Sequence, residues 1–420
     1  MAFGLRYFAA SFVIFCSGLL FPFQQASGAD TDCWTRYFGE PGSVITDVVS
    51  NPQGIWITGR IAEEGSSPTL WIALLDSKGR VQWQQRLPAT GYQLYPRLSS
   101  SLESMWVIAE TPLPSVPAPG GGSVTASQVW IGKITLDGRL ISQQTLAPHR
   151  VNTVQAVSGI EDGGVLLAGL VETGADMHSR GWVAQLDREG KLIRQQILPQ
   201  VSWLSSLKKM ETDQWLIAGT AHEKEGDQRP WLAVVNRRGD IQQSWKPDIQ
   251  GFCLYSALAV SNDFWLAGEW TAARSGAGLI RMDRTSGRVT EYSATGFSVL
   301  RLLAVEPRGL LAGGDGMGEN QPAAPESAPG WLSLDPGGME SHMRSQKIPE
   351  APAKVSRLRH IPHGELHAWT FCVPDRIVSD RLMLIGAGAT IARGAWVGCI
   401  RPMYINPDNP VPHAAPKSVQ

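Results

Sequence analysis

Four charged residues hold similar places along the chain and together could bind an anion. Asp47, Arg97, Arg301 and Arg357 each precede, at a similar distance, a short and mostly apolar run. Gln155, Ser205 and Ser256 hold the corresponding places before the other runs. Guanidinium groups bind carboxylate, sulfate and phosphate through paired hydrogen bonds. Three arginines with one acid therefore favour a small anionic ligand.

Two interpretations of this set remain open. The side chains could line a common pocket, or they could be solvated side chains without a ligand. The distinction depends on strand register, because a slip of one residue turns a side chain to the other face of its sheet.

The remaining histidines, cysteines, serines and acidic residues do not form a recognised catalytic or metal-binding motif. His360, His363 and His367 cluster near the end of the chain, and histidine is a common metal ligand. His363 lies between Pro362 and Gly364 in a predicted turn, so we interpret the cluster as a surface feature. No Gly-x-Ser-x-Gly, His-Glu-x-x-His or phosphate-binding Gly-rich motif occurs. We assign no catalytic residue, no metal and no cofactor.

The elements that must position these residues recur with a period of about 50 residues. A phrase that begins with Trp and ends in Asp-x-x-Gly closes at glycines 48 to 59 residues apart: Gly79, Gly138, Gly190, Gly239, Gly287 and Gly338. Segments of strand length, separated by Gly, Asp and Asn, lie between the phrases. The pattern predicts a β-propeller with four antiparallel strands per blade. We interpret the Asp-x-x-Gly segments as turns, not calcium loops.

One apolar run per repeat gives the blade count. It occurs at 55–59, 105–109, 165–169, 215–219, 264–268 and 309–313, with a degraded copy at 366–370. We therefore predict an all-β, seven-bladed propeller over residues 30–405. The equivalent tryptophans are predicted to pack between blades: Trp71, Trp130, Trp182, Trp231 and Trp331.

The last repeat lacks a fourth strand, and the segment at 33–38 is predicted to supply it. Antiparallel pairing with 396–401 would close the ring, and closure removes an exposed sheet edge. Cys33 and Cys399 could then form a disulfide, which would stabilise the fold by about 4–5 kcal/mol in the chain-entropy relation. We interpret Cys253 and Cys372 as buried thiols.

The two ends of the chain differ from the repeat. Arg6, an apolar run up to Phe21 and small residues before Ala29 are typical of a secretory signal, here residues 1–29. A retained membrane anchor is the alternative. We predict cleavage, a periplasmic or secreted protein, and no membrane span afterwards. Residues 406–420 are Pro-rich and predicted to be disordered.

Charge excludes one class of partner. The chain has 37 basic and 38 acidic residues and a formal net charge of −1. This balance offers no excess of cations to neutralise phosphates, so nucleic acid is not expected as a partner. We expect a monomer.

The fourth strand of several repeats contains a Gln pair, as at Gln84 and Gln85 and at Gln143 and Gln144. With the tryptophan phrase, this resembles exported bacterial propeller proteins of the broad quinoprotein-like and seven-bladed group, over about residues 33–401. The resemblance implies the fold, and propellers serve as enzymes, receptors and scaffolds alike. A quinone-binding redox role ranks third, because the Trp-x-x-x-x-Gly phrase of quinone-dependent dehydrogenases is missing.

Long connections indicate where a ligand would bind. The connections between second and third strands are longest at 111–123 and 314–330, and all such connections lie on one face of a propeller. Long loops on one face mark either a binding side or plain linkers. We predict a non-catalytic recognition or scaffold protein that binds a protein or a small anion there. The alternative is a hydrolase or lyase at the channel mouth, with Asp47 and an arginine or histidine.

Overall fold

The structure is a computed structural model, and its described residues all belong to the unit Cys33–Gln420. They are residues 35–38, 43–62, 67–90, 95–101, 103–113, 116–117, 123–124, 126–147, 149, 151–172, 178–211, 213–222, 228–271, 276–293, 297–306, 309–316, 329–334, 346–347, 371–372, 382–386 and 395–400. The predicted signal at 1–29, the histidine cluster at 360–367 and the tail at 406–420 lie outside them.

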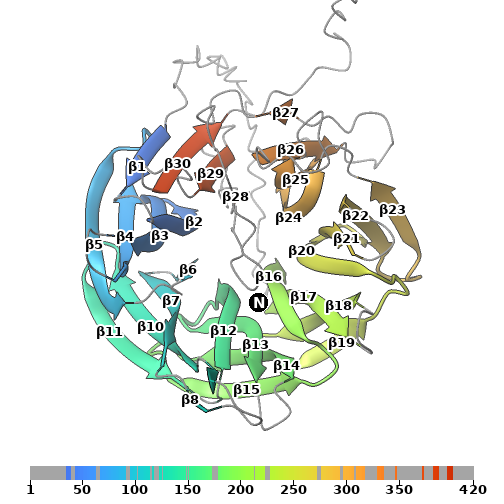
Figure 1. The fold of residues 1–420 in the computed structure, drawn as a ribbon, viewed down its shortest axis with the longest axis horizontal. Helices are drawn as coiled ribbons and strands as arrows, with labels where there is room; N and C mark the ends of the chain where they lie inside the picture. Colours follow the sequence, from blue (N-terminus) through green and yellow to red (C-terminus); the bar gives the residue numbers. More distant parts are fainter. Residues whose placement is uncertain are drawn as a thin grey trace, which may run out of the picture. The chain divides into compact units, whose positions relative to one another are not determined.

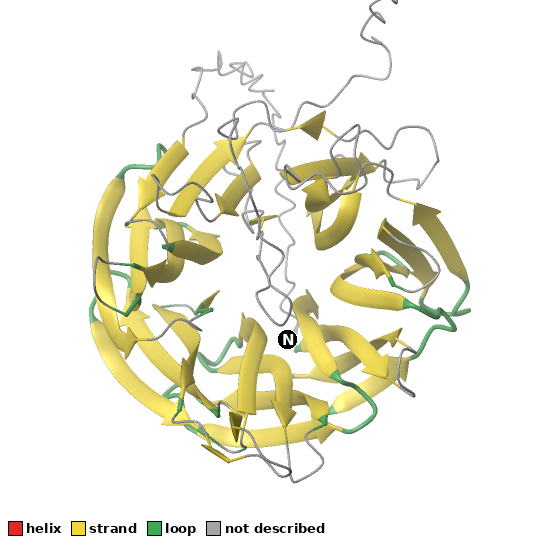
Figure 2. Cartoon of the chain, viewed as in Figure 1, coloured by secondary structure: helices red, strands yellow, loops and turns green. Residues whose placement is uncertain are grey.

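Every secondary-structure element in the described part of the chain is a β-strand, as predicted (Figure 2). The strands form antiparallel sheets of four. Sheet 1 contains β2 (Val44–Asn51), β3 (Gly54–Ile61), β4 (Thr69–Leu75) and β5 (Val81–Thr90). Sheet 2 contains β6 (Arg97–Ser100), β7 (Ser104–Pro112), β10 (Ser127–Thr135) and β11 (Leu140–Leu146). A small hairpin of β8 (Val116–Pro117) and β9 (Ser123–Val124) lies between β7 and β10.

The next sheets repeat this order. Sheet 3 contains β12 (Val151–Gly159), β13 (Val165–Glu172), β14 (Ser179–Leu186) and β15 (Leu192–Leu198). Sheet 4 contains β16 (Trp203–Glu211), β17 (Gln214–His222), β18 (Gln228–Asn236) and β19 (Ile241–Trp245). Sheet 5 contains β20 (Phe252–Val260), β21 (Asp263–Trp270), β22 (Gly276–Asp283) and β23 (Val289–Ser293). Sheet 6 contains β24 (Phe297–Glu306), β25 (Gly309–Gly316), β26 (Pro329–Leu334) and β27 (Gln346–Lys347).

A further sheet, sheet 7, joins the two ends of the described chain. It contains β28 (Phe371–Cys372), β29 (Leu382–Gly386), β30 (Ala395–Ile400) and β1 (Thr35–Phe38). β1 pairs antiparallel with β30, and Thr35 lies opposite Gly398. Cys33 lies outside the described residues, so the predicted disulfide with Cys399 stays a prediction.

The predicted second strand of this last sheet was wrong. The run at 366–370 precedes β28, and the strand that pairs with β30 is β29 at Leu382–Gly386. This segment, Leu-Met-Leu-Ile-Gly, has the apolar run and the closing glycine of the other second strands. The position from which Arg357 was counted is therefore displaced, and Arg357 itself lies outside the described residues.

The first strand of each sheet lies innermost, and the sheets follow one another in chain order (Figure 1). β2 contacts β6, β6 contacts β12, β12 contacts β16, β16 contacts β20, and β20 contacts β24. β2 also contacts β28, β29 and β30 of sheet 7. Four-stranded antiparallel sheets packed face to face around common inner strands are the architecture of a β-propeller.

The apolar core lies between the sheets. Buried clusters join sheets 1 and 2, 2 and 3, 3 and 4, 4 and 5, and 5 and 6. Phe38 of β1 packs on Trp71 of sheet 1, with ring centroids 5.0 Å apart. The predicted packing role of the repeated tryptophans is confirmed for Trp71, Trp130, Trp182 and Trp231, which are at most 5% exposed. Each large apolar side chain so buried contributes roughly 1.5–3 kcal/mol.

A recurring glycine at the end of the second strand follows from a bulge in the inner strand. In sheet 4, Ser205 is an extra residue between Leu204 and Ser206, which pair with Gly219 and Ala218. A Cβ on Gly219 would lie 2.0 Å from the Trp203 carbonyl oxygen. The same close approach occurs in three other sheets, at Gly59, Gly169 and Gly268.

Sheet 2 is the exception, and it supports this explanation. Its inner strand β6 begins at Arg97, opposite Ile108, so no paired residue of β6 faces Ala109. Ala109 occupies the place that Gly219 holds in sheet 4 and is fully buried there.

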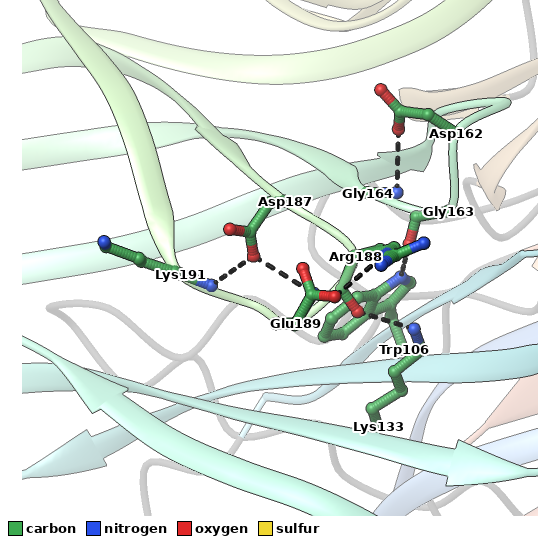
Figure 3. Close-up of polar contacts among 9 residues, drawn as sticks. All are labelled: Trp106, Lys133, Asp162, Gly163, Gly164, Asp187, Arg188, Glu189 and Lys191. Carbon is green, nitrogen blue, oxygen red and sulfur yellow. Dashed lines mark hydrogen bonds and ion pairs between the residues drawn. The ribbon is translucent and has the colours of Figure 1, made fainter.

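Hydrogen bonds fasten neighbouring sheets at the end that carries the third-to-fourth turns. In the turn after β14, Asp187 accepts from the main-chain nitrogens of Glu189 and Lys191, as predicted for a turn (Figure 3). Lys133 of sheet 2 donates to the carbonyl oxygen of Arg188 in sheet 3, and Trp106 Nε1 donates to that of Gly163 (Figure 3).

Glutamines of the fourth strands also form hydrogen bonds between neighbouring sheets. Gln85 donates to the carbonyl oxygen of Gly138, and Gln144 donates to that of Gly190, each in the next sheet. The Gln pairs that suggested the family resemblance are thus partly inter-sheet ties.

Replacing Gly219 with Ala tests the bulge. We expect Gly219→Ala to lower the free energy of unfolding by about 1–3 kcal/mol or more, because a backbone carbonyl must move. The matched control, Ala109→Gly, should cost about 1 kcal/mol or less. Urea denaturation of both variants measures the difference, and equal losses would contradict the explanation.

Candidate functional site

The predicted anion ligands Asp47 and Arg97 lie on neighbouring inner strands, at equivalent positions. Asp47 pairs with Thr58 in sheet 1, one residue after the bulge at Thr46. Arg97 opens β6 of sheet 2. Arg301 is itself the bulge residue of β24, between Leu300 and Leu302. The structure thus brings Asp47 and Arg97 together and gives Arg301 the preceding position in its strand.

The carboxylate of Asp47 forms a link between two sheets. Its Oδ2 accepts from the Leu98 nitrogen in sheet 2 at 2.7 Å, and its Oδ1 accepts from the Val48 nitrogen at 2.9 Å. Burial raises the pKa of Asp47, while the charges of Arg97 and Lys208 oppose that rise.

Two serines form the same inter-sheet link elsewhere in the ring. Ser206 Oγ accepts from the Ala257 nitrogen at 3.3 Å, and Ser256 Oγ accepts from the Leu303 nitrogen at 3.2 Å. The position after the bulge is therefore a structural one, and Asp47 adds a charge to it.

Arg97 ties its strand to those on both sides. Its Nη1 donates to the Thr46 carbonyl oxygen in sheet 1, and its Nε donates to the Gln155 carbonyl oxygen in sheet 3, both at 3.0 Å. Burial lowers the pKa of Arg97, and the charge of Asp47 opposes that change. Two of its nitrogens, Nε and Nη1, thus hydrogen-bond to main-chain carbonyl oxygens of neighbouring sheets. Anion binding by Arg97 stays a prediction.

A third charged group stands near this pair. Lys208 lies on β16 of sheet 4, yet its ammonium charge lowers the pKa of Asp47 in sheet 1. The effect of Lys208 on this pKa is smaller than that of Arg97.

Sequence reasoning missed Arg60, which follows the recurring glycine at the end of the apolar run of β3. Its guanidinium lies over the ring of Tyr95, with the Cζ atom 5.4 Å from the ring centroid. Its Nε and Nη1 are buried and have no hydrogen-bond acceptor among the residues that the structure describes. A buried donor without an acceptor costs about 1–3 kcal/mol. Its place after the recurring glycine was the signal in the sequence, but nothing there showed that its donors lack acceptors.

Three further residues lie together near the starts of β16 and β20 and the end of β21: Trp203, Tyr255 and Glu269. Tyr255 is the bulge residue of β20, and its hydroxyl donates to Glu269 Oε1 at 2.6 Å. The rings of Tyr255 and Trp203 have centroids 6.3 Å apart. Trp203 Nε1 is buried, and none of the described residues accepts a hydrogen bond from it.

These residues share one face of the fold. Arg60, Trp203, Tyr255 and Glu269 lie near the starts of inner strands or the ends of second strands, where the second-to-third connections leave the sheets. We name this side the loop face. The opposite side carries the regular turns and their ties.

Metal binding finds no support in the described part of the chain. No group of three or more His, Cys, Asp or Glu side chains there could hold a metal ion. Nor do those residues include a helix that could span a membrane. Cys253 is buried, as predicted, and Cys372 lies in β28.

Comparison with known proteins gives similarity of fold alone. No protein-family model matches the chain, and no curated protein matches it. The β-propeller domain of the Trilobed protease from Pyrococcus furiosus is 9% identical, with a TM-score of 0.46, and the match covers 87% of this chain and 94% of that chain. The phage phi92 endosialidase is 9% identical, with a TM-score of 0.45, and the match covers 90% of this chain and 71% of that chain. Such values transfer no residue role or activity.

The two kinds of inter-sheet link can be compared by mutation. We expect Ser206→Ala to cost about 1 kcal/mol, because the Ala257 nitrogen loses its acceptor. Asp47→Ala should cost about 3–5 kcal/mol, because it also leaves Arg97 buried without its counter-charge. Chemical denaturation of both variants checks the order, and a smaller loss for Asp47→Ala would show that its charge does not stabilise Arg97.

Proposed function

We propose that this chain is an exported, seven-bladed β-propeller that recognises a small anionic ligand on its loop face without catalysis. The seven four-stranded sheets among the described residues support the blade count. The pairing of β1 with β30 supports closure of the ring by the N-terminal strand. Export rests on the signal-like residues 1–29, and a disulfide between Cys33 and Cys399 would suit an oxidising compartment.

Arg60 carries the ligand part of this proposal. It is half-buried on the loop face, and two of its nitrogens have no acceptor in the described part of the chain. A guanidinium held over an aromatic ring is already oriented, so binding costs it little conformational entropy. A ligand with carboxylate, sulfate or phosphate oxygens would supply the missing acceptors.

Charge also bears on the kind of ligand. Arg97 and Lys208 on the inner strands are cationic, and Asp47 offsets part of their charge. The whole chain is almost neutral, with a net charge of −1, so the attraction is local. This favours a small anion over an extended polyanion.

The test measures binding of citrate and of sulfate to the mature protein by calorimetry. We expect Arg60→Gln to weaken the binding of the better probe at least about tenfold, because charge-assisted hydrogen bonds are lost. Arg139→Gln is the matched control, since Arg139 lies exposed beside Asp137 in a turn on the opposite side. Equal affinity of the wild type and Arg60→Gln for both probes would contradict the proposal.

A hydrolase is the second candidate, and the contact between Tyr255 and Glu269 favours it. A hydroxyl 2.6 Å from a carboxylate is the geometry of a nucleophile or proton donor beside a base. Turnover of chromogenic esters and glycosides by the wild type, abolished in both Tyr255→Phe and Glu269→Gln with the fold retained, would support this candidate. Activity that survives in both variants would exclude that pair from catalysis.

A further inference from the structure

A carboxylate and two aromatic rings lie together on the loop face, where the inner strands of sheets 4 and 5 contact each other. Trp203 begins β16 of sheet 4 and pairs with Thr220. Tyr255 is the extra residue of the bulge in β20 of sheet 5, and Glu269, near the end of β21, pairs with Cys253. Trp203, Tyr255 and Glu269 are each half-buried, so part of each remains accessible to solvent.

The polar atoms that this cluster offers to a ligand are hydrogen-bond acceptors. Tyr255 donates its hydroxyl proton to Glu269 Oε1 at 2.6 Å, the length of a charge-assisted hydrogen bond. A phenol has one such proton, so toward a ligand its oxygen can only accept. An ionised carboxylate only accepts as well, at about four lone-pair positions. Trp203 Nε1 is buried, so its N–H is not offered at the surface.

The charge of Glu269 is not neutralised by a basic side chain in the described part of the chain. The ion pairs between described residues all involve other acids. Arg229, at the loop-face end of β18 in sheet 4, forms its ion pair with Asp248 at 2.9 Å. The cluster therefore presents a negative charge together with its acceptors.

The aromatic rings favour the same kind of ligand as the carboxylate does. The rings of Trp203 and Tyr255 have centroids 6.3 Å apart and are inclined to each other by 31°. The face of an aromatic ring attracts cations, and tryptophan attracts them most strongly. Ring faces and carboxylate thus act on one ligand group in the same direction.

We propose that Trp203, Tyr255 and Glu269 form a binding site for an organic cation that carries a guanidinium group, such as an arginine side chain. A guanidinium is planar, stacks on aromatic faces and donates paired hydrogen bonds to a carboxylate. It is also more weakly hydrated than an ammonium, which suits a half-buried site. The hydrogen bond from Tyr255 holds the Glu269 carboxylate in place, so binding orders it at less entropic cost.

This site is independent of the anion proposed above, because it uses residues of sheets 4 and 5 and not Arg60 of sheet 1. The bulge and the place after the recurring glycine occur in several sheets, but the described sheets put this set of side chains there once, at Tyr255 and Glu269. The loop face would then bind groups of opposite charge at different sheets.

The experiment compares two probes, Nα-acetylarginine amide and Nα-acetylcitrulline amide, by ligand-observed NMR titration of the full chain. The probes have nearly the same shape, but the citrulline side chain is uncharged. We expect the arginine probe to bind at least about tenfold more tightly, because only its charge strengthens the hydrogen bonds and the contact with the rings.

Variants assign this preference to the cluster. Glu269→Gln should weaken binding of the arginine probe at least about tenfold, because the charge-assisted hydrogen bonds are lost. Trp203→Leu should weaken it about threefold or more, and Trp203→Phe should weaken it less, because phenylalanine keeps a ring face. The matched control is Glu211→Gln, which removes an exposed carboxylate at the far end of β16 and should bind as the wild type does.

Three results would overturn the site. The first is equal affinity of the wild type for the two probes. The second is a loss in Glu269→Gln no larger than that in Glu211→Gln, and the third is wild-type affinity in both Trp203 variants. Circular dichroism checks that each variant is folded, and Trp203→Phe alone tests the ring if Trp203→Leu does not fold. Failure here leaves the anion test intact, because that test uses citrate, sulfate and Arg60→Gln.

Discussion

The structure depends on one constraint, which is that each four-stranded sheet must bury both of its faces against neighbouring sheets. The apolar clusters all lie between sheets, and Trp106, Trp182 and Trp215 are fully buried there. No sheet has a core of its own, so its stability is shared with the next one. This explains why the residues that repeat from sheet to sheet are those that pack or hydrogen-bond between sheets. The candidate ligand-binding residues do not repeat. The same constraint also explains why the strand β1 matters beyond its length, since its Phe38 packs on Trp71 of sheet 1.

The contact between two neighbouring sheets has different hydrogen bonds at its two ends. At the end with the regular turns, side-chain donors such as Lys133 and Trp106 donate to carbonyl oxygens of the next sheet. At the loop face, buried donors of Arg60 and Trp203 have no acceptor among the described residues, and Asn152 Oδ1 has no donor among them. Unsatisfied buried groups cost stability. At Arg60, the proposed anionic ligand would supply the missing acceptors.

The sequence predicted the strands of sheets 1 to 6 well, because each strand reads as an apolar run between turn residues. It misplaced the second strand of sheet 7, since 366–370 and 382–386 are both short runs and only the latter ends in glycine. It also mixed two positions in the inner strands. Gln155 and Ser205 are bulge residues, whereas Asp47 and Ser256 follow the bulge, and a bulge adds a residue that spacing alone does not reveal. Arg60 was missed because its environment comes from Tyr95, on another segment.

The residue after the recurring glycine of the second strand shows where function can vary at low structural cost. The glycine is fixed by the bulge opposite it, but the next residue only has to extend the strand toward the loop face. The sheets use this freedom differently, with Arg60, Glu110, Thr220 and Glu269 at this place. Thr220 keeps a structural role, since its hydroxyl accepts from the Leu254 nitrogen. The other three are ionisable and half-buried, and Arg60 and Glu269 have different partners, Tyr95 and Tyr255. A repeat that fixes one residue by sterics and frees its neighbour can therefore build an asymmetric site on a symmetric frame.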